Sequence, residues 1–384
     1  MTFTIDRSNW TRVRFGDVVR KSKEKVNPTL GEVEYYVAGE HMETDNLHID
    51  NKGIIGDGYL GPAFHMRFHP GQVLYGSRRT YLRKVAYADF DGVCANTTFV
   101  LETADDSKLA GRFLPFVMQA EPFHEHAIAV SKGSTNPYVN WPDIAAYEFL
   151  LPPIEEQHRI ADLLWQFERH RIELDQLAKE SSTTIQGISD MSLTSCPLGD
   201  LSSLCKLEAS LLSPDTEGFM TLPHVGIDRI DPLTGAIEIT HTAGEDHVKS
   251  GKFYFREGDV LYAKIRPNLR KVGIAYRDGL CSADCYPLTP SAGISPELLR
   301  VVLLSKSVYE QAVALSARTA MPKLNRKQLF SIPVPVPDEA TSEKIYSLIS
   351  IQRVLVSKID EELLKAEQMK RSLLAEVFGG SDVC

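Results

Sequence analysis

Two long stretches of the chain carry mostly apolar side chains at alternating steps of three and four residues, interrupted by polar residues such as His170 and Gln352. The second stretch, from Ile345 to Glu376, has the same steps as the first stretch at an offset of 185 residues. The first comprises Ile160, Leu163, Phe167, His170, Leu174, Leu177, Ser181, Thr184, Ile188 and Met191. This spacing puts all of these positions on one face of an α-helix in a heptad register. We therefore predict two long amphipathic helices. Packing of each helix on its own domain is the alternative, but two helices of equal length in the same register favour pairing with each other through this face.

A proline-rich connector precedes each predicted helix, at residues 151–154 and 332–337. Proline disfavours helix at the residue before it and is tolerated in a first helical turn. The acidic residues that follow, Glu155-Glu156 and Asp338-Glu339, suit the positive end of a helix dipole. Both connectors are therefore predicted to be extended and to end where a helix begins.

The segments between the helices have the pattern of short strands and turns. Residues 71–75 and 258–262 are apolar, β-rich runs opened by glycine. Asp91-Gly92 and Asp278-Gly279 have the composition of tight hairpin turns. The pattern predicts a mixed α/β (α+β) globular domain before each long helix.

The two halves are copies of one another. Residues 68–101 and 255–288 align without a gap at an offset of 187, with 15 of 34 positions identical. A tandem duplication explains this agreement. We predict a recognition domain at 1–153, a helix at 154–192, a second recognition domain at 193–337 and a second helix at 338–384.

Composition narrows the class of protein. The net charge is −9, from 42 basic and 51 acidic residues, which argues weakly against non-specific nucleic-acid binding. Six scattered cysteines do not make a disulfide framework, and no apolar run is long enough to span a membrane. We expect a cytoplasmic protein that does not contact membranes.

A pair of basic loops carries the candidate chemistry. Residues 77–84 and 264–271 each hold four positive charges and no acid. The shared pairs Arg83-Lys84 and Arg270-Lys271 are interpreted as phosphate anchors. The residues that differ between the loops are interpreted as base readers. They are Ser77, Arg78 and Tyr81 in the first loop and Lys264, Pro267 and Asn268 in the second. The shared Arg79 and Arg266 lie among them. A solvated charged hairpin is the alternative.

A second polar loop lies upstream of each connector, at residues 131–138 and 316–323. Its small polar and basic side chains suit phosphate oxygens, although an ordinary turn is an equally good interpretation. The candidate residues are Lys132, Ser134, Thr135 and Asn136 in the first half and Arg318, Thr319 and Lys323 in the second.

Catalytic and metal motifs are weak. Cys281 and Cys285 are spaced like half of a metal site, but only Cys281 has a cysteine, Cys94, at the matching position of the other repeat. Buried strand cysteines are therefore the better interpretation. No phosphate-binding glycine loop of the nucleotide-binding kinds is present. We expect neither a catalytic centre nor a metal.

Several motifs resemble those of the specificity subunits of type I restriction–modification systems. Residues 151–161, LPPIEEQHRIA, resemble the family's entry into its first central helix, and 133–138, GSTNPY, resemble a loop upstream of it. The opening at 9–18 is similar to the family's domain start and is echoed at 196–201. The second connector departs from the pattern, with Ser342 where the family has glutamine.

The resemblance implies a non-catalytic DNA-recognition subunit. Each globular domain would read one half of a split target on double-stranded DNA. The helices would pair antiparallel, set the gap between the half-sites and dock two methyltransferase subunits, which restriction subunits would join. S-adenosylmethionine, ATP and Mg²⁺ would bind those partners only. The helix and subunit interface would comprise Gln157, Ile160, Leu163, Phe167, Leu174, Leu177, Ile345, Leu348, Leu355, Ile359, Met369 and Leu373.

Two other functions compete with this interpretation. An adenine methyltransferase would need an Asn/Asp-Pro-Pro-Tyr/Phe loop, and the nearest candidate, Leu151-Pro-Pro-Ile154, lacks both the polar and the aromatic residue. A coiled-coil scaffold with protein-binding domains would leave the duplicated basic loops without an explanation.

Overall fold

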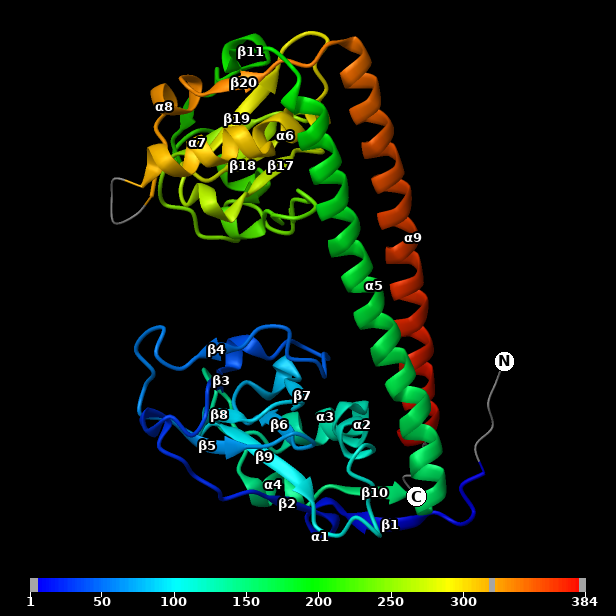
Figure 1. Cartoon of the computed structure of the whole chain (residues 1–384). Helices are drawn as coiled ribbons and strands as arrows, with labels where there is room; N and C mark the ends of the chain where they lie inside the picture. The colour runs from blue at the N-terminus through cyan, green and yellow to red at the C-terminus, as the bar shows by residue number, and fades with distance from the viewer. Residues whose placement is uncertain (1–5, 318–321, 380–384) are drawn as a thin grey trace. The chain divides into compact units, whose positions relative to one another are not determined.

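The computed structural model describes residues 6–317 and 322–379. The chain forms two compact units (Figure 1). Unit 1 combines Met1–Glu173 with Glu362–Cys384, and unit 2 is Leu174–Glu361. Unit 1 is therefore built from two separate stretches of the chain, whereas unit 2 is continuous.

The first four-stranded sheet is the same in both units and is antiparallel throughout. In unit 1 its order is β2 (Val19–Lys21), β9 (Thr98–Thr103), β6 (Val73–Gly76) and β7 (Val85–Tyr87). In unit 2 its order is β12 (Cys205–Lys206), β19 (Cys285–Pro290), β16 (Val260–Ala263) and β17 (Val272–Ile274). Tyr75 opposes Phe99 as Tyr262 opposes Tyr286, so the sequence offset of 187 is kept in space.

A second sheet shares three strands between the units and differs at one edge. The shared strands are β3 (Tyr35–Val37), β8 (Gly92–Ala95) and β5 (Phe64–Phe68), matched by β14 (His224–Val225), β18 (Gly279–Cys281) and β15 (Lys252–Phe255). Unit 1 adds β4 (Gly53–Ile54) beside β3, whereas unit 2 adds β13 (Leu211–Leu212) beside β15. The repeats therefore diverge at the sheet edge and agree at its centre.

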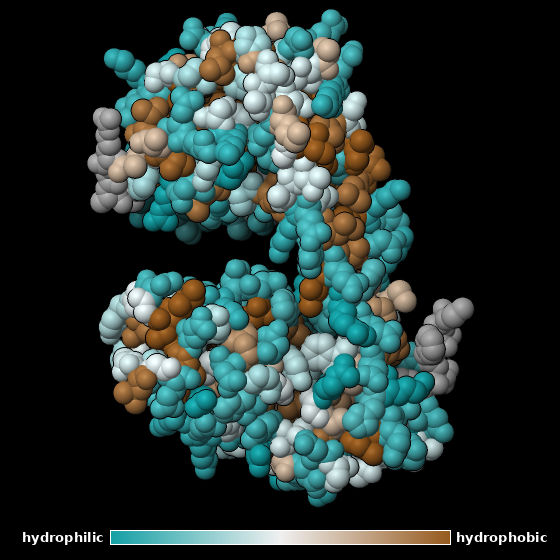
Figure 2. All heavy atoms as spheres, in the orientation of Figure 1, coloured by the Kyte–Doolittle hydropathy of each residue, from teal (hydrophilic) through white to brown (hydrophobic). Residues whose placement is uncertain are grey.

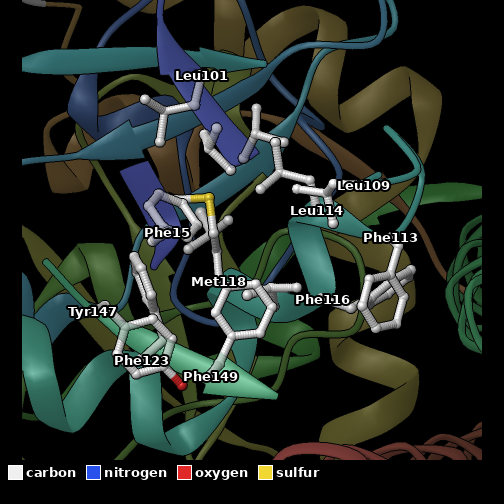
Figure 3. Packing of buried hydrophobic residues seen from close by; sticks show 14 of the residues in the cluster. Phe15, Leu101, Leu109, Phe113, Leu114, Phe116, Met118, Phe123, Tyr147 and Phe149 are labelled. Carbon is white, nitrogen blue, oxygen red and sulfur yellow. The ribbon is translucent and has the colours of Figure 1, made fainter. Parts of the chain in front are cut away.

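Short helices pack beside the first sheet and contribute to the core of each unit. Unit 1 has α1 (Phe15–Val18), α2 (Leu114–Gln119), α3 (Glu121–Ala129) and α4 (Trp141–Ala145), and unit 2 has α6 (Pro296–Leu304), α7 (Lys306–Ser316) and α8 (Arg326–Phe330). In unit 1 the rings of Phe15, Phe116 and Phe123 pack in a buried cluster (Figure 3). A two-stranded ladder closes each domain: β1 (Thr11–Arg14) with β10 (Glu148–Leu151), and β11 (Leu198–Asp200) with β20 (Pro333–Pro335).

Two long helices follow the globular domains: α5 (Ile154–Thr194) and α9 (Glu339–Phe378). The two helices run antiparallel and contact each other in both units. In unit 1, Lys370 of α9 pairs with the buried Glu168 of α5. In unit 2, Gln352 donates to the Ser182 hydroxyl at 3.0 Å. The predicted mixed α/β fold with two duplicated domains and two packed helices is confirmed. Within the described residues no helix could cross a membrane.

The predicted hairpin turns at Asp91-Gly92 and Asp278-Gly279 are wrong. Strand β7 pairs in the first sheet and β8 in the second, so the two strands that flank Asp91 are not partners. Neither glycine has a positive φ. A Cβ on Gly92 would instead lie 2.6 Å from the Phe68 ring, and one on Gly279 would lie 2.7 Å from the Phe255 ring. The repeated glycine therefore permits close packing and does not make a turn.

Candidate nucleic-acid interface

In unit 1 the two predicted loops lie side by side. The 77–84 loop leaves strand β6 and turns through a short 3₁₀ helix, η3 (Thr80–Leu82). The Arg79 N–H donates to the Pro137 carbonyl at 2.6 Å, and the Val139 N–H donates to the Ser77 carbonyl at 3.0 Å. Backbone bonds thus join residues 77–84 and 131–138 into one surface, which we call loop pair 1.

Unit 2 repeats this junction. Its basic loop turns through η7 (Pro267–Leu269). The Arg266 N–H donates to the Pro322 carbonyl at 2.8 Å, and the Leu324 N–H donates to the Lys264 carbonyl at 2.8 Å. Residues 264–271 and the described part of the second loop, from Pro322, form loop pair 2. Arg318 and Thr319 lie outside the described residues.

Both loop pairs rest on the same strained backbone. Arg79 and Arg83 flank η3 with φ of 52° and 51°, and Arg266 and Arg270 flank η7 with φ of 46° and 53°. Side-chain-bearing residues disfavour this left-handed conformation, which persists only where the surroundings impose it. The duplicated strain shows that the shape of this turn, as well as its charge, is shared by both repeats.

The predicted phosphate anchors bind within their own domains. Arg83 donates to the carboxylates of Asp45 at 2.8 Å and Glu121 at 2.7 Å. In unit 2 the equivalent Arg270 donates to the Leu304 carbonyl at 2.7 Å and lies over the ring of Tyr309.

The lysines beside these arginines are also engaged. Lys84 donates to the Gly39 carbonyl at 2.6 Å, and Lys271 donates to the Ile227 carbonyl at 2.9 Å. These carbonyls belong to matching 3₁₀ helices, η2 (Gly39–His41) and η6 (Ile227–Arg229). We therefore interpret the shared Arg-Lys pair as residues that hold the loop in place in each unit, in place of the earlier interpretation as phosphate anchors.

Two predicted base readers are covered as well. Ser77 is buried, and its hydroxyl donates to the Thr97 carbonyl at 2.6 Å. Pro267 is buried in η7. Neither side chain has a free polar group to offer a base, so both belong to the frame of the loop.

The remaining candidates are exposed, apart from Lys264, which is half-buried. In loop pair 1 they are Arg78, Arg79, Tyr81, Lys132, Ser134, Thr135 and Asn136, and in loop pair 2 they are Arg266, Asn268 and Lys323. Arg79 donates to the Asn136 side chain at 3.3 Å, while Lys132 pairs with Asp143 and Lys323 with Asp284. Tyr138, 39% exposed beside Arg78, was not assigned from sequence, although an aromatic residue in a polar loop was the available signal.

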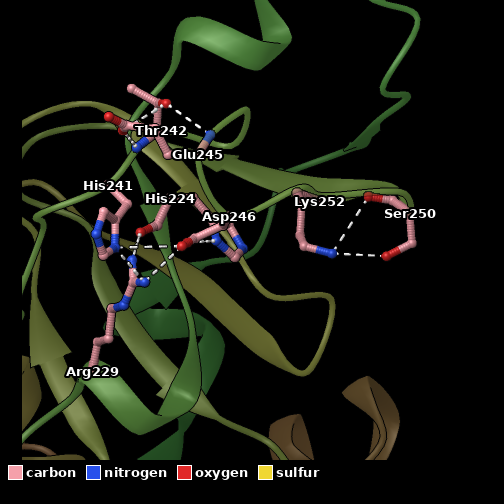
Figure 4. A network of polar contacts seen from close by, with 8 residues as sticks. All are labelled: His224, Arg229, His241, Thr242, Glu245, Asp246, Ser250 and Lys252. Atoms are coloured by element: carbon pink, nitrogen blue, oxygen red, sulfur yellow. Dashed lines mark hydrogen bonds and ion pairs between the residues drawn. The ribbon is translucent and has the colours of Figure 1, made fainter. Parts of the chain in front are cut away.

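The polar cluster around Asp246 in unit 2 holds a loop together. Asp246 accepts from His224 at 2.7 Å and from Arg229 at 2.8 Å, and His241 lies beside Arg229 (Figure 4). Burial raises the pKa of the Asp246 carboxyl, but the bonds from Arg229 and His224 outweigh it and leave the pKa below its ordinary value. The cluster thus fixes an ionised carboxylate between two segments of the domain.

Two cysteines of unit 2 are buried in its strands. Burial raises the pKa of the Cys285 thiol to about 12 and that of Cys281 well above its ordinary value. Buried thiols of this kind are protonated and unreactive. Over the described ranges, no three His, Cys, Asp or Glu side chains are grouped to hold a metal ion.

The predicted helix seam is displaced by one residue on α5. Besides Gln157, Ile160 and Leu193, the buried positions of α5 each come one residue after a predicted position: Ala161, Leu164, Glu168, Ser182, Ser189 and Ser192. Of the residues assigned to the interface, Ile160, Ile345 and Ile359 are buried, and Phe167, Leu174, Leu348, Leu355 and Leu373 are half-buried. Leu163, Leu177 and Met369 are 41%, 44% and 59% exposed. Figure 2 shows hydrophobic atoms at the surface of the long helices.

Gln157 is buried inside unit 1 and is not available to a partner. Its amide donates to the carbonyls of Lys108 and Pro152, both at 2.8 Å, and its side-chain oxygen accepts from the Ala110 N–H at 2.9 Å. The side chain therefore locks the start of α5 to the domain that precedes it.

The chain is similar to known type I specificity proteins. The family described as "Type I restriction modification DNA specificity domain" matches residues 7–182. The EcoDI specificity subunit of Escherichia coli is 28% identical over 300 residues, which are 65% of each chain. The match over residues 7–182 indicates a type I DNA specificity domain in the first half of the chain.

One further curated protein and one solved structure are similar to the chain. A putative type I specificity subunit of Mycoplasma pneumoniae is 28% identical over 29% of this chain and 35% of its own length. A solved structure described as the "structural basis underlying complex assembly and conformational transition of the type I R-M system" has a similar fold, with a TM-score of 0.50 and 17% identity over 96% of this chain and 97% of that one. The match to the E. coli specificity subunit spans just under two thirds of its length.

Proposed function

We propose that the chain is the DNA-specificity subunit of a type I restriction–modification complex and that each loop pair contacts one half of a split DNA target. The observation that carries the proposal is the recurrence of one strained loop frame with different exposed side chains. Arg79 and Arg266 are the same residue at the same place, whereas Tyr81 is replaced by Asn268. A shared frame with variable tips suits two readers that dock alike and recognise different bases.

The side chains divide between two tasks. The shared arginines Arg79 and Arg266 are assigned to the DNA backbone, together with Lys132 and Lys323. Tyr81 and Asn268 are assigned to base edges, because they are exposed and differ between the repeats. Ser134, Thr135 and Asn136 would add hydrogen bonds to phosphate oxygens.

The long helices are assigned to partner subunits. Leu163, Leu177 and Met369 expose large apolar side chains, which suits docking of methyltransferase subunits, to which restriction subunits would add. In this assignment the helices also set the gap between half-sites, and S-adenosylmethionine, ATP and Mg²⁺ are bound by the partners.

The test uses the chain co-purified with its methyltransferase subunit. The duplex probe carries the methylated-adenine motif read from the source genome, and two further probes scramble one half-site each. Tyr81→Ala and Asn268→Ala should each relax preference in a different half by about 1–3 kcal/mol. Tyr59→Ala, which alters a side chain 92% exposed outside the loop pairs, should change neither half.

Three outcomes would contradict the proposal. Equal loss of binding to cognate and scrambled duplex in both variants would remove the base-reading assignment. Methylation by the chain alone, without a partner, would support a stand-alone methyltransferase. Absence of DNA binding by the intact complex would favour a protein-binding scaffold.

A further inference from the structure

In each unit a lysine ammonium group lies over an aromatic ring at the same place in the fold. Lys21 Nζ is 3.9 Å from the centroid of the Phe99 ring, and Lys264 Nζ is 4.9 Å from that of Tyr286. Phe99 and Tyr286 are equivalent, since each opposes the tyrosine of the matching Val-Leu-Tyr strand, Tyr75 or Tyr262. The two domains therefore hold a positive charge at the same point.

The two lysines come from different positions in the repeat. Lys21 ends strand β2, whereas Lys264 follows strand β16 in the basic loop. The residue that matches Lys264 in unit 1 is the buried Ser77. On the unit 2 side, Lys206 opposes Thr289, so the residue that matches Lys21 is the buried Leu207. Duplication alone does not produce this coincidence, which indicates that a charge is required at this point in both domains.

Neither ammonium group is neutralised inside the part of the chain that the structure describes. No ion pair involves Lys21 or Lys264 there, and Asp284, the carboxylate near Lys264, pairs with Lys323. Burial lowers the pKa of Lys21 and, together with the charge of Lys323, that of Lys264. A half-buried cation without a counter-ion is a site ready to accept an external anion.

Both lysines adjoin the loop pairs. The Lys264 carbonyl accepts the bond from Leu324 that joins loop pair 2. In unit 1 the strand segment before Phe99 reaches loop pair 1, because the Ser77 N–H donates to the Thr97 carbonyl at 3.0 Å. An anion at Lys21 or Lys264 would therefore lie at the edge of the surface assigned to DNA.

We propose that Lys21 and Lys264 each contact one phosphate of the DNA backbone and that these two contacts are equivalent in the two half-sites. This inference rests on the proposed function. The ring beneath each ammonium group restrains the flexible lysine stem before DNA binds, which reduces the ordering cost on association. Because the contact is the same in domains that read different bases, it is sequence-independent.

The experiment measures the salt dependence of binding by the intact complex to cognate and scrambled duplex. The slope of log affinity against log salt is negative, and Lys21→Gln and Lys264→Gln should each make it shallower by about 0.9. The change should be equal for both duplexes. The double variant should make the slope shallower by about twice as much. Lys21→Arg and Lys264→Arg should retain the slope, because arginine keeps both the charge and the ring contact. Lys206→Gln, which removes an exposed lysine paired with Glu208, is the matched control and should leave the slope unchanged.

A relocation variant separates the charge from its source. Lys21→Leu combined with Ser77→Lys moves the ammonium group of unit 1 to the position that unit 2 uses, and it should recover the slope lost in Lys21→Leu alone. An unchanged slope in glutamine variants that still bind, or a change confined to one unit, would overturn the inference. In that case the proposed function would stand, because none of the three outcomes that contradict it would have been observed.

Discussion

Arg83 and Arg270 occupy the same place in the two domains and are held there by different chemistry. Arg83 is paired with two carboxylates, and the buried His124 lies beside this group. Arg270 bonds a helix-terminal carbonyl and lies over Tyr309, which stands where unit 1 has His124. The comparison teaches that selection has kept the shape of the loop, while its bracing changed from ionic in unit 1 to neutral and aromatic in unit 2.

The largest difference between the units is expected where the long helices begin. Leu164→Asp places a charge in the core of unit 1, where the side chain is fully buried, and should cost about 4 kcal/mol or more. The equivalent Ile349 in unit 2 is only half-buried, so Ile349→Asp should cost less. All three tryptophans, Trp10, Trp141 and Trp165, belong to unit 1, so their fluorescence reports its unfolding by denaturant.

Leu163→Asp is the control for this comparison. Leu163 is 41% exposed and should tolerate the charge with a loss below about 1 kcal/mol. If Leu163→Asp proved as damaging as Leu164→Asp, the one-residue displacement of the helix seam would be refuted.

The next difference concerns the glutamine that the second repeat lacks. Gln157→Ala removes three buried hydrogen bonds and should destabilise unit 1 by about 2–4 kcal/mol. The half-buried Ser342 stands in its place in unit 2, and Ser342→Ala should change stability by no more than about 0.5 kcal/mol. Tryptophan fluorescence follows the first variant, and hydrogen exchange of unit 2 amides follows the second. Similar losses in both units would mean that the serine has taken over the role of the glutamine.

The smallest expected effect is a pH dependence confined to unit 1. Burial lowers the pKa of His124 to about 4, against about 6.5 in an unfolded chain, so the unfolded state binds the proton first. The preference of the folded state for neutral His124 therefore stabilises it fully above about pH 6.5, and this stabilisation is lost as the pH falls towards 4. Between pH 7 and pH 5 the free energy of unfolding should fall by about 2 kcal/mol. His124→Phe should remove this part of the pH profile, measured by tryptophan fluorescence, while Tyr309→Phe should not. A profile that His124→Phe leaves unaltered would contradict the assignment.

The fold was largely predictable, because the spacing of apolar residues and the internal repeat of the sequence both indicate it. The three-and-four spacing located both long helices, and the gapless repeat located the matching domains. The helix phase was not predictable, because α5 packs against its own domain through Leu164 as well as against α9. Leu163 therefore looks like a seam position in the sequence and lies at the surface in the structure.

The site was predictable only as a region. The sequence located both basic loops, but it could not show that Arg83 and Arg270 turn back into the protein, because their partners, Asp45 and Leu304, lie 38 and 34 residues away along the chain. The identity of these residues in both repeats indicated that they are important. It did not show whether they hold the loop in place or bind DNA. Lys21 escaped notice for the converse reason, since no residue at the matching position shares its charge.

The discontinuity of unit 1 has a consequence for how the protein is made. Leu374 and Val377 of α9 complete the same buried cluster as Leu164, yet the ribosome adds them about 210 residues later. At about 5–20 residues per second, this corresponds to a delay of about 10–40 s. During that interval the nascent first domain exposes apolar surface that only the returning helix can cover. Unit 2, whose stretch of chain is continuous, is not subject to this delay. Chaperone demand during synthesis should therefore fall mainly on the domain that is translated first and completed last.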